Sequence, residues 1–218
     1  MVKIYKCLCY LLFMKIVCLE GCSGTGKTTQ YHLLNDSYGR SGLRHIAVVE
    51  KDYEPFKSAV KKWHKMKGPS VPFTEEDVRN FAKARAETFV NNFPNLEDKI
   101  DLILMDRYFY TSAVYQRNCG LKPKEILQIN IEYGAPIPDL TFLFDCNPYV
   151  CFERANKRNL ITGGRHLFST SPERISDIKE QYLKLMSGRE EVKIIDSSRP
   201  ISGVNQDLII DINFLFYE

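Results

Sequence analysis

The 218-residue chain lacks most of the features that mark a specialised class of protein. It has no internal repeat and no low-complexity segment, and its 30 basic side chains nearly balance its 27 acidic ones. Such a small excess of positive charge gives no reason to expect a nucleic acid or a membrane as a partner. With 44% hydrophobic and 26% charged residues, the composition is that of an ordinary globular domain and excludes a disordered chain or a fibre.

Cysteine and histidine are too scattered to suggest a metal site. The seven cysteines include no Cys-x-x-Cys pair, and the four histidines are not at ligand spacing. Several cysteines, such as Cys18, lie in apolar, strand-like runs, where a thiol usually behaves as a small buried hydrophobe. We therefore expect a reducing compartment and a cytoplasmic protein.

The sequence also lacks a hydrophobic run long enough to cross a membrane. The longest candidate, residues 7–19, contains Lys15 and leads directly into a glycine-rich loop at Gly21. A signal peptide is not expected, because no plausible cleavage site would spare that loop. We expect residues 1–13 to be an N-terminal extension, with Met14 as an alternative start, and residues 14–218 to form one domain.

Short apolar runs alternate with helical patterns along this domain. Most of the runs are nearly continuous, which is typical of strands that are covered on both faces. The five expected strands are residues 15–20, 45–50, 101–105, 140–144 and 192–195. Helix starts are expected at Thr74, Pro148 and Pro172, where capping residues stand at the beginning of helical patterns.

This alternation predicts an α/β fold in three layers, with a five-stranded parallel sheet between flanking helices. Ligands of such a doubly wound sheet bind at the carboxyl ends of its strands. A lid segment is expected at about residues 160–171, which contain two consecutive glycines.

One motif carries specific chemistry. The sequence from Gly21 to Thr28 fits G-x-x-x-x-G-K-[ST], and it lies between an apolar strand and a helical segment. In such a P-loop, backbone N–H groups and the positive end of the helix bind phosphate oxygens. Lys27 is expected to reach the β- and γ-phosphates, and Thr28 to ligate Mg²⁺. The predicted nucleoside triphosphate site consists of Gly21, Cys22, Ser23, Gly24, Thr25, Gly26, Lys27, Thr28 and Thr29.

A second motif, Asp106-Arg107-Tyr108, follows the third expected strand. In this topology Asp106 lies beside the P-loop and can hold Mg²⁺ through water. Arg107 offers a planar cation to the phosphate of a second substrate. An ordinary ion pair at the end of a strand is the alternative interpretation.

In their order, the motifs between residues 14 and 200 resemble those of the thymidylate kinase family of nucleoside monophosphate kinases. The similar segments are residues 19–30, the helix of residues 80–87, residues 106–116 and the Pro-Asp-Leu sequence at 138–140. The resemblance implies a P-loop kinase that transfers a phosphoryl group from ATP to a pyrimidine nucleoside monophosphate, most simply dTMP. It also implies Mg²⁺ as the cofactor, and it is compatible with a homodimer.

The resemblance assigns roles within the acceptor site and the lid. It implies that Phe81 stacks on the pyrimidine, that Arg85 hydrogen-bonds its carbonyl group and that Gln116 faces the base or the sugar. An aromatic core position is the alternative for Phe81. The expected acceptor-binding residues are Glu20, Phe81, Arg85, Arg107, Ser112 and Gln116. The expected catalytic residues are Lys27, Asp106, Arg107 and the lid residue Arg165, and Arg154 and Arg158 are expected to bind ATP or to form a solvated helix face.

Three positions depart from the family's pattern. Ser23 stands where the family usually has an aspartate that meets the acceptor's 3′-hydroxyl. Tyr53 replaces the arginine that clamps the acceptor phosphate, and Lys51 or Lys57 is a candidate substitute. Residues 165–168, Arg-His-Leu-Phe, only approximate the usual end of the lid.

Three other functions fit parts of the sequence. A nucleoside kinase would explain the missing clamp arginine and would need a general base, for which Glu20 is the candidate. A non-catalytic nucleotide-binding protein would retain the P-loop without an acceptor site. The lysines around Trp63 suggest a nucleic-acid patch, although such a run of charge is usually a solvated helix face.

Overall fold

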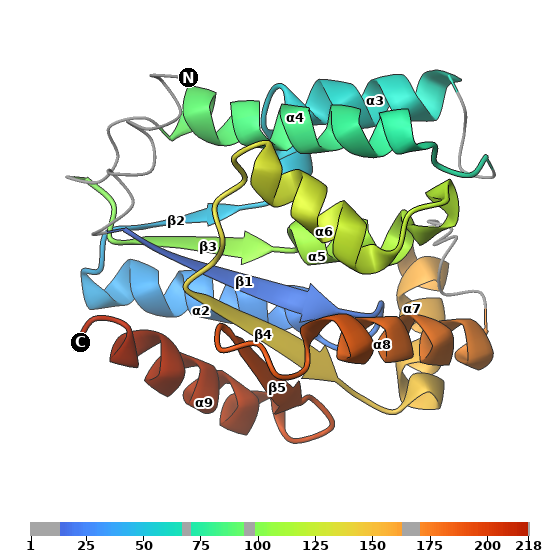
Figure 1. Ribbon diagram of the computed structural model, residues 1–218. Coiled ribbons are helices and arrows are strands. Elements are labelled where there is room, and N and C mark those ends of the chain that lie inside the picture. The colour runs from blue at the N-terminus through green and yellow to red at the C-terminus, as the bar shows by residue number, and fades with distance from the viewer. Residues whose placement is uncertain (1–13, 67–70, 94–98, 163–170, 218) are drawn as a thin grey trace.

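The computed structural model describes residues 14–66, 71–93, 99–162 and 171–217. Within these residues, five parallel strands form one sheet in the order β2-β3-β1-β4-β5, as Figure 1 shows. The strands are β1 (Lys15–Gly21), β2 (His45–Val48), β3 (Leu102–Asp106), β4 (Leu140–Asp145) and β5 (Val192–Asp196). The predicted parallel α/β sheet is confirmed. The expected extension at 1–13 and most of the expected lid, with Arg165, lie outside the described residues.

Helices cover both faces of the sheet (Figure 1). One face packs against α2 (Lys27–Ser41) and α9 (Ile201–Phe214). The other face carries α4 (Glu75–Asn92), α5 (Phe109–Tyr115), α6 (Pro123–Glu132) and α8 (Pro172–Met186). The remaining elements are α3 (Phe56–Met66), which packs on α4, α7 (Pro148–Thr162), which packs on α8, and the short 3₁₀ turns η1 (Glu50–Asp52) and η2 (Arg117–Cys119).

The helix ends follow from the capping residues. The Thr74 hydroxyl accepts from the backbone N–H of Asp77, whose carboxylate accepts in return from the backbone of Thr74, which completes a capping box. Ser171 caps α8 by accepting from the backbone N–H of Arg174. The second strand is shorter than predicted, because the chain turns into η1 at Glu50.

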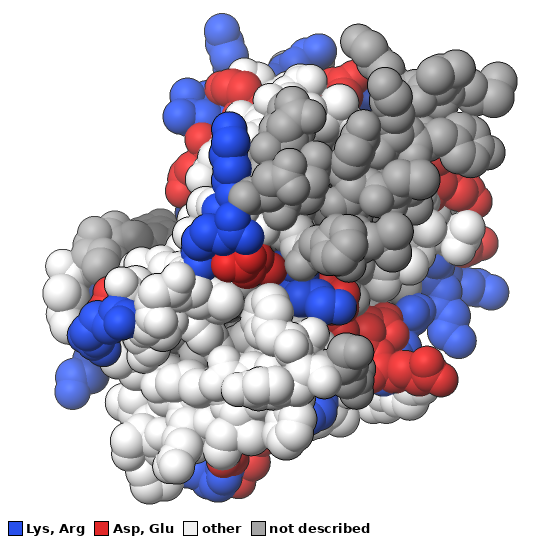
Figure 2. All heavy atoms as spheres, turned by 90° about the vertical axis from the view of Figure 1, so that its left-hand side faces the viewer, with Lys and Arg blue, Asp and Glu red and all other residues white. Residues whose placement is uncertain are grey.

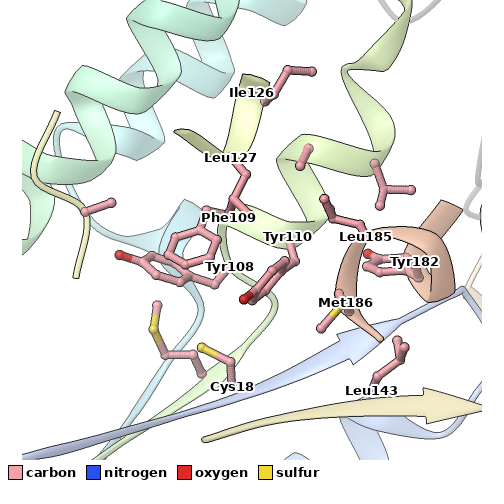
Figure 3. Packing of buried hydrophobic residues seen from close by; sticks show 14 of the residues in the cluster. Cys18, Tyr108, Phe109, Tyr110, Ile126, Leu127, Leu143, Tyr182, Leu185 and Met186 are labelled. Atoms are coloured by element: carbon pink, nitrogen blue, oxygen red, sulfur yellow. The ribbon is translucent and has the colours of Figure 1, made fainter. Parts of the chain in front are cut away.

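The alternation of side chains along β1 divides the core into two layers. Ile16 and Cys18 point to the layer under α4, α5, α6 and α8, whereas Val17 and Leu19 point to α2 and α9. Figure 3 shows the first layer, where aromatic residues of the segment 108–110 fill the space between the sheet and helices α6 and α8. Because helices cover both faces of the sheet, the functional groups that the sheet positions lie at the ends of its strands.

Figure 2 shows the side of the molecule where the strands of the sheet begin. Charged side chains of both signs are scattered there, and the lower half, where α9 ends, is mainly uncharged. Phe214 and Tyr217, at the end of α9, are 60% and 84% exposed. Among the described helices, none has the length and hydropathy needed to span a membrane.

The loop after β1 packs closely against the start of α7. Gly24 has a φ of +84°, and a Cβ atom there would lie 2.1 Å from the backbone oxygen of Cys151. Gly26 has a similar φ of +91°, but a Cβ atom there would meet nothing within 4 Å. The two glycines therefore carry the same backbone constraint, and only Gly24 carries a steric one.

We predict that Gly24→Ala lowers the free energy of unfolding more than Gly26→Ala does. Both variants strain a left-handed backbone, but only the first forces α7 away from the loop, which costs about a further 1–3 kcal/mol. Denaturant unfolding of both variants measures the difference. Equal losses would show that the contact with α7 is not close.

Candidate functional site

A cavity of about 830 Å³ opens at the carboxyl ends of the strands. The P-loop forms one side of it, and η1, α3 and α4 form the other. The segment that follows β3 lies between these two sides, and α7 contributes Arg154 and Arg158. The cavity can therefore hold two ligands in one space, one at the P-loop and one beside α4.

The P-loop side of the cavity holds a buried lysine, whose ammonium group lies against two oxygen atoms of the loop. The Lys27 ammonium donates to the carbonyl oxygen of Cys22 and to the hydroxyl of Thr25. Burial, with a contribution from Arg107, lowers the pKa of Lys27 to about 7. A bound polyphosphate would stabilise the charged form of this lysine.

Thr28 and Asp106 bring two oxygen-bearing side chains together across the site. The Thr28 hydroxyl donates to Oδ2 of Asp106 over 2.9 Å. The other carboxylate oxygen of Asp106 is buried and has no hydrogen-bond partner in the described part of the chain. Hydroxyl, carboxylate and phosphate oxygens are the ligands that Mg²⁺ prefers, so this pair fits that ion.

Glu20 is fully buried and organises the segment after β3. One of its oxygens accepts from the backbone N–H groups of Tyr108 and Thr111, at 2.8 and 3.1 Å. The other accepts from the hydroxyls of Thr111 and Tyr182, at 2.6 and 3.2 Å. Burial raises the pKa of Glu20, against the opposing effects of Arg107 and of these hydrogen bonds.

Arg107 is held beside this carboxylate in an uncommon backbone conformation. Its φ is 71°, in the left-handed region that non-glycine residues rarely adopt. Its Nη1 donates to the carbonyl of Gly21 and to the hydroxyls of Thr111 and Tyr182. These contacts fix the guanidinium between the P-loop and α8, where it lines the cavity.

On the α4 side, Arg85 lies inside the cavity wall with only 1% of its surface exposed. Its Nε and Nη2 donate to the two carboxylate oxygens of Glu50, at 2.6 and 2.8 Å. Nη2 also donates to the Ser112 hydroxyl, and Nη1 donates to the side-chain oxygen of Asn130. The pKa of Glu50 is raised, because the effect of burial outweighs the lowering effect of the Arg85 guanidinium.

Aromatic side chains of α3, of α4 and of Phe73, just before α4, complete this wall. The Phe81 ring contacts the rings of Phe56 and Phe73 edge-on, at centroid distances of 5.6 and 5.9 Å. Trp63 stacks on Phe73 at 4.3 Å with an interplanar angle of 5°. Trp63 thus belongs to the cavity wall, which disfavours its use as an exposed platform for nucleic acid.

Most of the predicted site residues come together in the cavity. Those that line it are Ser23, Gly24, Gly26, Lys27, Thr28, Thr29, Phe81, Arg85, Asp106, Arg107, Ser112, Gln116, Arg154 and Arg158. Gly21, Cys22 and Thr25 belong to the P-loop but do not line this cavity, and they border a second, much smaller one. Glu20 lies beneath the site instead of lining it.

The sequence did not reveal four residues that shape the site. Glu50 stands at the expected end of a strand, and its pairing with Arg85 leaves no signal in the local pattern. Asn130 and Tyr182 contact the site from α6 and α8, far along the chain. Thr111 precedes Ser112, which is the hydroxyl-bearing residue of this segment that the sequence analysis singled out, and it is Thr111 that donates to Glu20.

Comparisons with known proteins agree with this arrangement. The family model described as thymidylate kinase matches residues 19–208. The thymidylate kinase of Leptospira interrogans is 28% identical over 194 residues, which cover 89% of each chain. A probable thymidylate kinase of Archaeoglobus fulgidus is 26% identical over 88% of this chain and 92% of its own. Probable thymidylate kinase 1 of Saccharolobus solfataricus is 29% identical over 89% and 95%.

The matched region begins at the end of β1 and runs into α9, so it includes the P-loop, the segment after β3 and the whole wall formed by α3 and α4. By this match and by the order of its motifs, the chain belongs to the thymidylate kinase family.

Proposed function

We propose that the protein transfers the γ-phosphoryl group of ATP to dTMP, which gives ADP and dTDP. The observation that carries this proposal is the continuity of the cavity, which joins the P-loop to the wall that contains Phe81 and Arg85. A nucleoside monophosphate kinase needs both substrates in one space, with the two reacting phosphates facing each other.

ATP binds with its phosphates on the P-loop and at the start of α2. The backbone N–H groups and the helix N-terminus meet the phosphate oxygens, and Lys27 meets the β- and γ-phosphates. Thr28 and Asp106 would hold Mg²⁺, which supplies neutralising charge on the phosphates when it is bound. Arg154 and Arg158 face the same space from α7, and Arg165 completes the set of donor-side arginines in this proposal.

The acceptor binds beside α4. Phe81 stacks on the pyrimidine, and Arg85 donates to a carbonyl oxygen of the base. Gln116 is 5% exposed, and its Oε1 has no partner among the described residues, so it is available to a donor on the base or sugar. Arg107 and Lys51 both line the cavity, and in this proposal they bind the acceptor phosphate.

Chemistry at this site requires positioning and charge more than proton transfer. The attacking oxygen of a monophosphate is already anionic, so no general base is needed. Glu20 fits this mechanism, because its two oxygens already accept four hydrogen bonds and hold the segment that carries Arg107. The role of general base, which a nucleoside kinase would require, is not favoured by this geometry.

The proposal extends to the surroundings of the protein. We place it in the cytoplasm, which agrees with five free cysteines in the described residues. We also propose a homodimer, for which the exposed apolar end of α9 offers contact area.

We predict ADP release from Mg·ATP in the presence of dTMP, measured by a coupled assay against dUMP, dCMP, UMP, AMP, GMP and thymidine. Lys27→Ala serves as the blank and should lose at least about 100-fold in kcat, because it removes charge stabilisation from the transferring group. Turnover with thymidine alone would indicate a nucleoside kinase. Silence with every acceptor, despite binding of ATP, would indicate a non-catalytic nucleotide-binding protein.

Lys51 offers a second test, which concerns the acceptor phosphate. Lys51→Ala should raise the KM for dTMP by about three- to tenfold and leave the KM for ATP unchanged, because one partly solvated cation is removed. Lys57→Ala is the matched control, since Lys57 lies in the first turn of α3 and does not line the cavity. Equal effects of the two substitutions would contradict a specific role for Lys51.

A further inference from the structure

The buried pair of Glu50 and Arg85 stands out in the wall of the acceptor side. The two side chains are 7% and 1% exposed, and their contact is bidentate. Taking two charges out of water costs free energy. Apolar residues of similar volume in place of a buried ion pair often leave the folded protein equally or more stable. A buried ion pair at a cavity wall therefore calls for an explanation other than stability.

The hydrogen bonds of Arg85 leave it little freedom. A guanidinium has five N–H groups. In the described structure, Glu50 takes two of them, Ser112 takes one and Asn130 takes one. Among the described residues, none accepts from the second N–H of Nη1.

Two aromatic rings also pack against the guanidinium. Its central carbon lies 4.8 Å from the centroid of the Phe56 ring and 5.3 Å from that of the Tyr108 ring. Arg85 still lines the cavity, although only 1% of its surface is exposed. The donor that Arg85 can still offer to a ligand is thus this one N–H, held on a guanidinium that its other hydrogen bonds fix in place.

We propose that Glu50 is a positioning residue that sets the specificity for the acceptor base by fixing Arg85 in this orientation. This inference rests on the proposed function. A single N–H matches a carbonyl oxygen, such as the 4-oxygen of thymine or uracil. Cytosine carries an amino group at that position and would place one donor against another. The carboxylate of Glu50 also cancels the charge of Arg85, so the wall does not attract phosphate to the place of the base.

Replacing the carboxylate by an amide should relax this selection. In Glu50→Gln, one oxygen acceptor is lost and an NH₂ group faces a guanidinium N–H. Arg85 then has an unpaired charge and a spare donor, and it can shift. We expect the ratio of kcat/KM for dTMP to that for dCMP to fall at least about tenfold, with the KM for ATP unchanged.

The epistasis between the two positions tests whether Glu50 acts through Arg85. Arg85→Met should lower the same ratio, and adding Glu50→Gln to it should cause no further loss. The double variant removes both charges and is therefore expected to fold at least as well as the single ones. Asp52→Asn is the matched control, because it neutralises an exposed carboxylate on the same 3₁₀ turn.

Folding of each variant is checked by circular dichroism and thermal unfolding. Glu50→Asp serves as the second variant, because it keeps the negative charge and withdraws it by one methylene group. If Glu50→Gln does not fold, Glu50→Asp is expected to show a smaller fall in the dTMP-to-dCMP ratio. An unchanged ratio in whichever of the two folds, or a further fall in the double variant beyond Arg85→Met, would overturn the proposal.

The result is separable from the test of the function itself. A wild-type protein that turns over neither dTMP nor dCMP contradicts the proposed function. A wild-type protein that prefers dTMP, together with Glu50 variants of unchanged preference, contradicts only the role of Glu50.

Discussion

The site depends on one buried carboxylate. Glu20, at the end of the central strand β1, accepts hydrogen bonds from Tyr108, Thr111 and Tyr182, which belong to the segment after β3 and to α8. These bonds satisfy both oxygens, and so they offset the cost of burying the charge. They also fix the left-handed turn at Arg107, which places its guanidinium beside the P-loop.

A similar arrangement recurs on the α4 side of the cavity. There Glu50 holds Arg85, with Asn130 and Ser112 completing the hydrogen bonds. In both places a buried acidic group restricts an arginine that lines the cavity. Positioning of this kind suits phosphoryl transfer, in which the protein supplies orientation and fixed charge rather than new covalent bonds.

The sequence predicted the fold well, because buried parallel strands are apolar runs and the P-loop has a fixed pattern. It did not predict where β2 ends, since Glu50 is drawn into η1 and into contact with Arg85, 35 positions along the chain. It placed Phe81 and Arg85 in the cavity but gave no hint of Asn130, which approaches from α6. Patterns along the chain report local periodicity, whereas such polar contacts form only when distant helices pack together.

In the proposed reaction, the γ-phosphoryl group passes directly from ATP to dTMP in the shared cavity. Phosphorus-31 NMR of Mg·ATP and dTMP with a catalytic amount of the protein tests this claim most directly. We expect the signals of ADP and dTDP to grow together while those of ATP and dTMP decline. Release of inorganic phosphate without dTDP, or an unchanged dTMP signal in the presence of bound ATP, would contradict it.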